Sequence, residues 1–95
     1  MRLFFRETPL GDITEVGSDQ PWWVGQFAPY AEADAFRAFF EWMVDEEKSS
    51  LPGDPPFDEA LWTDENWFIE DDSGQKRGIC VPAVHNDGQI WWRPK

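Results

Sequence analysis

The residues with the most obvious chemical potential are Cys80 and His85, the only cysteine and the only histidine of the chain. A thiol beside an imidazole can act as a nucleophile with its base, provided that a third group orients the base. The sequence contains no GxSxG elbow, no glycine-rich phosphate loop, and no CxxC or HExxH motif. We therefore predict no catalytic residue, no bound metal and no cofactor. An enzyme that uses Cys80 and His85 is the least favoured hypothesis.

Carboxylates are the second chemical resource of this chain. Nineteen Asp and Glu face eight Lys and Arg, which gives a net charge of -11, and residues 32–72 hold fourteen of the acids but two of the bases. The acidic turns at 70–74 (EDDSG) and 86–88 (NDG) could hold calcium, although neither has the spaced oxygen ligands of an EF-hand loop. Asp and Gly are also the residues that turns need. A small-ligand or calcium-binding domain is therefore an alternative function.

The concentration of negative charge favours binding to a basic protein surface. It would repel nucleic acid and anionic membranes, whose phosphates carry the same sign. Nuclease inhibitors and phosphate mimics place carboxylates where phosphates would lie, and the charge accelerates the encounter with the partner. We therefore predict a non-catalytic protein-binding module, the plainer alternative being that the charge only maintains solubility. The predicted binding residues are Asp45, Glu46, Glu47, Asp54, Asp58, Glu59, Asp64, Glu65, Trp42 and Trp62.

Length and cysteine content limit the domain count and the compartment. Ninety-five residues form one domain, 1–95, with no room for a second core. Because Cys80 has no partner within the chain, a disulfide-stapled secreted scaffold is excluded and a reducing cytoplasm is favoured. No apolar run approaches the length of a membrane span. We expect a soluble cytoplasmic protein that is a monomer or a weak dimer.

Hydrophobic periodicity predicts an α+β fold, in which an antiparallel meander of about six short strands (βββ-α-βββ) carries one main amphipathic helix on one face. The helix is expected from Ala31 to Glu47, because Phe36, Phe39, Phe40 and Met43 recur at helical spacing. Residues 48–66 are predicted to be an acidic loop, rich in proline and glycine, with a short helical turn capped by Asp58. Turns are predicted at 8–12 (TPLGD), 17–21 (GSDQP) and 87–88, and Pro82 indicates an edge or a bulge in the strand at 77–84.

Two tryptophan doublets, Trp22-Trp23 and Trp91-Trp92, fall in predicted strands. Neighbouring side chains of a strand face opposite ways, so each doublet must send one ring to the helix side and one to the far side. The missing side chain of Gly25 could let a bulky neighbour approach closely. The far-side rings either form a second small core under the middle loop or make an exposed aromatic patch bordered by acids.

Three runs of the sequence carry a resemblance: LGDITEVGSDQPWWVGQF at 10–27, FAPY at 27–30 and DGQIWWR at 87–93. They resemble a group of small bacterial proteins of unknown function with a leucine-glycine pair, a short strand, an aspartate, a proline-tryptophan pair and a phenylalanine-x-proline entry into a helix. The group often has a threonine cap where this chain has Tyr30 and Ala31. No activity is attached to the group, so the resemblance implies no functional residue.

Overall fold

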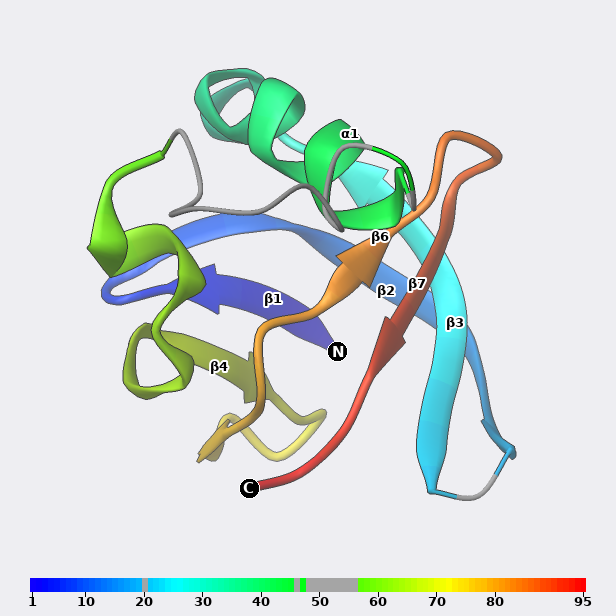
Figure 1. Cartoon of the computed structure of the whole chain (residues 1–95). Coiled ribbons are helices and arrows are strands. Elements are labelled where there is room, and N and C mark those ends of the chain that lie inside the picture. The colour runs from blue at the N-terminus through cyan, green and yellow to red at the C-terminus, as the bar shows by residue number, and fades with distance from the viewer. Residues whose placement is uncertain (20, 46, 48–56) are drawn as a thin grey trace.

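The protein is one antiparallel sheet of seven strands with a single α-helix, as seen in a computed structural model that describes residues 1–19, 21–45, 47 and 57–95 (Figure 1). The α+β meander predicted from the sequence is confirmed, with seven strands in place of about six. The elements are β1 (Arg2–Phe5), β2 (Thr8–Asp19), β3 (Trp22–Pro29), the 3-10 helix η1 (Ala31–Phe36), α1 (Arg37–Val44), the 3-10 helices η2 (Glu59–Trp62) and η3 (Asp64–Asn66), β4 (Trp67–Glu70), β5 (Lys76–Gly78), β6 (Ala83–Val84) and β7 (Gln89–Trp92).

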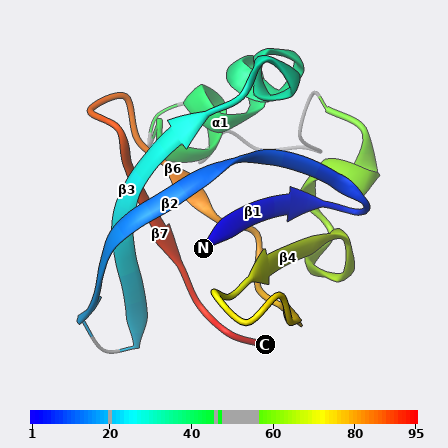
Figure 2. The same ribbon diagram turned by 180° about the vertical axis from the view of Figure 1, so that it is seen from behind.

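The sheet curls until its two ends meet (Figures 1 and 2). Its order is β5-β4-β1-β2-β3-β7-β6, and β5 and β6 belong to one continuous stretch, 76–84. At the junction the Ile79 N–H donates to the Trp67 carbonyl at 3.0 Å, while Ile79 also bridges Pro94 and the Cys80 N–H donates to the Arg93 carbonyl at 2.9 Å. The stretch therefore pairs with β4 through its first half and with the C-terminal strand through its second half.

Pro82 lies buried between β5 and β6, where the regular pairing is interrupted. Proline has no N–H to contribute to a ladder, so an interruption is expected at this residue. The strand predicted at 77–84, with an edge or a bulge at Pro82, is instead divided into the two short strands β5 and β6. The hairpin predicted at 87–88 is also present, because Gly88 has a φ of 90° and the His85 N–H donates to the Gln89 carbonyl across the turn.

The helical segment begins at Ala31 as predicted, but it starts as a 3-10 helix and continues as an α-helix. Residues 31–36 form a 3-10 helix, and the α-helix that follows ends at Val44, because Asp45 has an extended backbone. A negative side chain opposes the helix dipole at a C-terminus, so Asp45 is an unfavourable residue with which to continue α1. Tyr30 makes no side-chain capping bond to η1, and its hydroxyl donates to Asp12 instead. No helix in the described ranges is both long enough and apolar enough to cross a membrane.

The reversal predicted at 17–21 is present, because Asp19 at the end of β2 pairs with Trp22 at the start of β3. The turn predicted at 8–12 is wrong, because β2 begins at Thr8 and continues through these residues. The chain reverses earlier, where Arg6 takes a left-handed φ of 56°. Proline and glycine at the start of β2 are accommodated by a shift of register between Leu3 and Phe4 of the neighbouring strand. A strand with such an irregular register can contain proline and glycine, the residues that led to the prediction of a turn.

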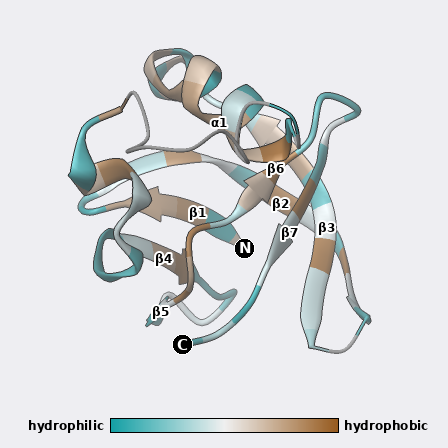
Figure 3. Ribbon diagram, in the orientation of Figure 1, coloured by the Kyte–Doolittle hydropathy of each residue, from teal (hydrophilic) through white to brown (hydrophobic). Residues whose placement is uncertain are grey.

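The core fills the curled sheet and is closed by the helix. Phe39 and Phe40 of α1 pack onto the inner face of the strands, where Trp67 is 0% exposed. In Figure 3 β1 is mostly hydrophobic, whereas the turn between β6 and β7 is hydrophilic. The buried cluster comprises Leu3, Leu10, Ile13, Phe27, Ala33, Phe39, Phe40, Trp67, Ile69, Ile79, Ile90 and Trp92.

Both tryptophan doublets lie on strands, and each is divided between the two faces of the sheet as predicted. Trp23 pairs with Trp92 on the inner side, and Trp92 is 4% exposed. Trp23 stands nearer the end of its hairpin and remains 39% exposed. Trp22 and Trp91 share the outer face, with their ring centroids 6.5 Å apart.

Replacement of Gly25 by alanine tests the close packing between β3 and β2. A Cβ at this position would lie 2.7 Å from Ile13 Cγ2 and 3.0 Å from the Thr14 carbonyl oxygen, whereas a Cβ at Gly17 would meet nothing within 4 Å. We expect Gly25→Ala to lower the free energy of unfolding by about 1 to 3 kcal/mol through overpacking. The matched Gly17→Ala change should leave it unchanged or slightly raised. Urea denaturation measures both, and equal stability of the two variants would contradict the packing.

Candidate functional site

The predicted acidic site is centred on η2 and η3. Asp58, Glu59, Asp64 and Glu65 are exposed there, and Trp62 between them is 37% exposed. Among the described residues, no Lys or Arg forms an ion pair with any of these four carboxylates. We call these five residues the acidic Trp62 surface. The predicted site residues Glu46 and Asp54 lie outside the residues that the structure describes.

Two of these carboxylates also hold the backbone. The Asp58 Oδ1 accepts the Ala60 N–H at 2.9 Å, which confirms the predicted cap of the helical turn. The Asp64 Oδ1 accepts the Val81 N–H at 2.8 Å and so ties η3 to the stretch that closes the sheet. These bonds fix the positions of the two side chains and stiffen the support of the acidic Trp62 surface.

Trp42, another predicted site residue, belongs to the packing between α1 and η2. Its ring stacks on Phe39 with a centroid distance of 6.4 Å and meets Phe57 at 5.7 Å. Asp45 and Glu47 follow directly after α1, where the Glu47 N–H donates to the Asp45 carboxylate at 3.0 Å. The half-buried Trp42 thus packs on Phe57, the residue before the Asp58 cap of η2.

Cys80 and His85 lie at opposite ends of β7. The Cys80 N–H donates to the Arg93 carbonyl and the His85 N–H to the Gln89 carbonyl. These two carbonyls are separated by the length of the strand, roughly 13 Å at the rise of an extended chain. The thiol and the imidazole are therefore not placed to share a proton, and the arrangement required for nucleophilic catalysis is not formed.

His85 lines a hollow of about 350 Å³ between the helix and the β6–β7 turn. Its floor includes the rings of Phe27 and Phe40, and its rim includes Asp34 and Arg37. Asp34 and Arg37 pair with each other at 3.3 Å. Glu41 also lines the hollow, so its lining carries two carboxylates and one guanidinium beside the apolar floor.

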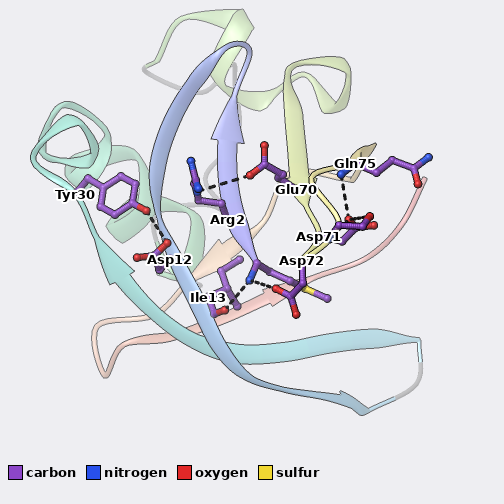
Figure 4. A network of polar contacts seen from close by, with 10 residues as sticks. Arg2, Asp12, Ile13, Tyr30, Glu70, Asp71, Asp72 and Gln75 are labelled. Carbon is purple, nitrogen blue, oxygen red and sulfur yellow. Dashed lines mark hydrogen bonds and ion pairs between the residues drawn. The ribbon is translucent and has the colours of Figure 1, made fainter.

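The acidic turn at 70–74 uses its central carboxylate for its own backbone (Figure 4). The Asp71 Oδ1 accepts bonds from the Ser73 hydroxyl, the Ser73 N–H and the Gln75 N–H. The hydrogen bond from the Ser73 hydroxyl, followed by that from the Gln75 N–H, lowers the pKa of Asp71 below its usual range. In the described part of the chain, no group of three or more His, Cys, Asp and Glu side chains could hold a metal ion.

The acids around this turn differ from those of the acidic Trp62 surface because they have cationic neighbours. The Arg2 Nε lies 3.7 Å from Glu70, and the N-terminal ammonium lies 3.1 Å from Asp72 (Figure 4). Arg77 lies 3.6 Å from Asp71. Negative charge is thus partly compensated here, whereas the carboxylates of η2 and η3 have no ion-pair partner among the residues that the structure describes.

A third site is a groove on the outer face of β2, β3 and β7, the far face for which the sequence predicted either a second small core or an exposed aromatic patch bordered by acids. Trp91 stands beside Gln26 and Gln89 in a hollow of about 390 Å³. The signal was present in the sequence, since Val24, Gln26, Gln89 and Trp91 occupy alternate positions of two strands. Recognising it required the register that pairs Val24 with Trp91 and Gln26 with Gln89. We call the hollow the Trp91 groove; it is lined by Glu15, Gly17, Ser18, Asp19, Val24, Gly25, Gln26, Gln89 and Trp91.

Comparison with protein-family models, with curated proteins and with solved structures gives no match. The resemblance to a group of small bacterial proteins therefore stays a prediction. Function has to be inferred from the surfaces of the molecule alone.

The lowered pKa of Asp71 predicts an acid-dependent contribution to stability. A carboxyl whose pKa is lower in the folded than in the unfolded state stabilises the fold above the unfolded-state pKa, and this contribution is lost as pH falls through the folded-state pKa. We expect an NMR titration to place the Asp71 midpoint below that of an ordinary aspartate. Ser73→Ala should raise this midpoint, because it removes the largest cause of the shift. The matched change Ser18→Ala should leave the Asp71 midpoint unmoved, and an equal effect of the two variants would contradict the role of Ser73.

Proposed function

We propose that this protein is a non-catalytic binding module for a basic protein surface. The observation that carries the proposal is the acidic Trp62 surface, in which an exposed indole stands among four carboxylates that have no ion-pair partner within the described residues. Tryptophan is enriched among the residues that dominate binding energy in protein interfaces. Uncompensated carboxylates around it would select a partner rich in Lys and Arg.

The carboxylates and the indole have different tasks in this proposal. The charges of Glu59 and Glu65, whose carboxylates make no bond to the backbone of the described residues, steer a basic partner towards the surface and accelerate association. Trp62 provides the apolar contact that slows dissociation, and its ring can also receive a cation on its face. A surface of this kind suits an inhibitor or a phosphate mimic, whose partner has a basic patch that otherwise binds nucleic acid.

The net charge and the single cysteine indicate which partners and which compartment suit this module. The negative net charge of -11 disfavours direct binding to nucleic acid and to anionic membranes. The single cysteine fits a partner met in the reducing cytoplasm. The module would act as a monomer or a weak dimer, so that the acidic Trp62 surface stays free for its partner.

The test is capture of a basic partner from the lysate of the host, followed by measurement of its association and dissociation with the purified module. Raising salt from about 0.05 M to about 0.5 M should slow association strongly, because the Debye length falls several-fold. Glu59→Gln with Glu65→Gln should slow association about tenfold at low salt. Trp62→Ala should mainly accelerate dissociation and weaken binding by about 2 kcal/mol or more.

The matched control replaces two exposed acids on other elements, Glu7→Gln with Glu32→Gln, and changes the net charge equally. It should slow association much less than the pair on η2 and η3. If both pairs have the same effect, or if binding is indifferent to salt, the acidic Trp62 surface is not the binding site.

A further inference from the structure

The Trp91 ring lines one side of the Trp91 groove, and the space beside it, over Gly17, is open. Gly17, Val24 and Trp91 are paired across three neighbouring strands and share the outer face. A side chain at Gly17 would meet nothing within 4 Å, so the space beside the indole is not filled by the protein. The half-buried indole of Trp91 therefore borders open space in which a flat ligand can lie.

The orientation of the Trp91 ring is fixed by its neighbours. Its Nε1–H donates to the Gln89 Oε1 at 3.3 Å. The Trp22 ring contacts it edge to face at 6.5 Å, and the His85 ring does the same at 6.3 Å. A ring held in this way loses little conformational freedom when a ligand binds, which favours affinity.

The rim of the groove is polar and carries both kinds of hydrogen-bonding group. The Gln26 amide provides donors and an acceptor, and Glu15 and Asp19 provide acceptors alone. Within the described ranges, these three side chains have neither a hydrogen-bond nor an ion-pair partner. They are free to bond a ligand that presents several groups able both to donate and to accept.

Several ligand classes do not fit this combination. A peptide that adds to a sheet bonds to the edge of a strand, whereas Trp91, Gln26 and Gln89 stand on the outer face of β3 and β7, which are paired with each other. A nucleic acid would face the two rim carboxylates of a protein with a net charge of -11. A simple cation would use the indole and the two rim carboxylates, but it would leave the hydrogen-bonding groups of the Gln26 amide unused.

We propose that the Trp91 groove binds a neutral oligosaccharide, with one sugar ring stacked on Trp91 and its hydroxyls bonded to Gln26, Gln89 and Glu15. The C–H groups on one side of a sugar ring are slightly positive and suit the negative face of an indole. Each hydroxyl both donates and accepts, as the mixture of amides and carboxylates requires. The volume of about 390 Å³ falls in the range of small-ligand sites. This site lies on other elements than the acidic Trp62 surface and does not depend on the basic partner.

The test is a titration of the isotope-labelled protein with three neutral trisaccharides, maltotriose, cellotriose and triacetylchitotriose, followed by NMR. At least one of them should shift the Trp91 indole N–H and the Gln26 side-chain amide in a saturable way, with a Kd of about 1 mM or lower. The Trp62 indole signal should not move. Tetramethylammonium chloride, the cationic probe, should leave the Trp91 signal in place.

Variants separate the groove from a general effect on the fold. Gln26→Ala removes one hydrogen-bonding group from the rim and should weaken the sugar about three- to tenfold. Trp91→Ala should abolish binding, while the matched Trp62→Ala should bind the sugar as the original protein does. The proposal is overturned if none of the trisaccharides shifts the Trp91 indole, if the cationic probe shifts it instead, or if Gln26→Ala binds with unchanged affinity.

Discussion

The indole of Trp67 is the interaction on which the rest of the structure depends. It is 0% exposed, and its Nε1–H donates to the Leu61 carbonyl at 2.8 Å. A buried N–H without an acceptor would cost the fold much of its stability, so this bond determines where η2 must lie. The ring also contacts Phe5 of β1 at 5.1 Å and Phe39 of α1 at 6.2 Å. One side chain therefore joins the first strand, the helix, the acidic turns and β4.

The central position of Trp67 has a direct consequence for the surface. Leu61, which accepts its hydrogen bond, is the residue before Trp62. The exposed indole is thus attached to a turn whose backbone is held from inside the core, and Asp64 holds the next turn to the closing stretch through Val81. Carboxylates on a support of this kind lose less freedom on binding than carboxylates on a loose loop. These bonds to the core hold the carboxylates near one another despite their mutual repulsion.

Much of this fold could be predicted from the residues, and the exceptions have physical reasons. Helical spacing of phenylalanines and the division of the tryptophan doublets depend on local geometry, and both were predicted. The path of β2 was not, because Pro9 and Gly11 signal a turn by their own preferences while the partner strand accommodates them in an irregular register. Conformational preference is a local property, whereas register is decided by strands that are distant in the sequence.

The candidate sites also differ in how far the sequence alone could predict them. A cluster of acids can be read directly from the sequence, and most of η2 and η3 was identified from it. The core position of Trp67 and the ties made by Asp64 could not be, since each depends on a partner brought from another part of the chain. The Trp91 groove is an extreme case, because its walls come from three strands whose register had to be known first.

The closure of the sheet by 76–84 has a consequence for the way the chain acquires its structure. This stretch joins β4 to the C-terminal strand, and β7 itself pairs with β3. The last residues of the domain must therefore reach strands formed by its first third before the ring is complete. Contacts between such distant segments carry a large loop entropy, which makes folding slow and strongly cooperative. A nascent chain of this protein would gain its full stability only after its final strand has left the ribosome.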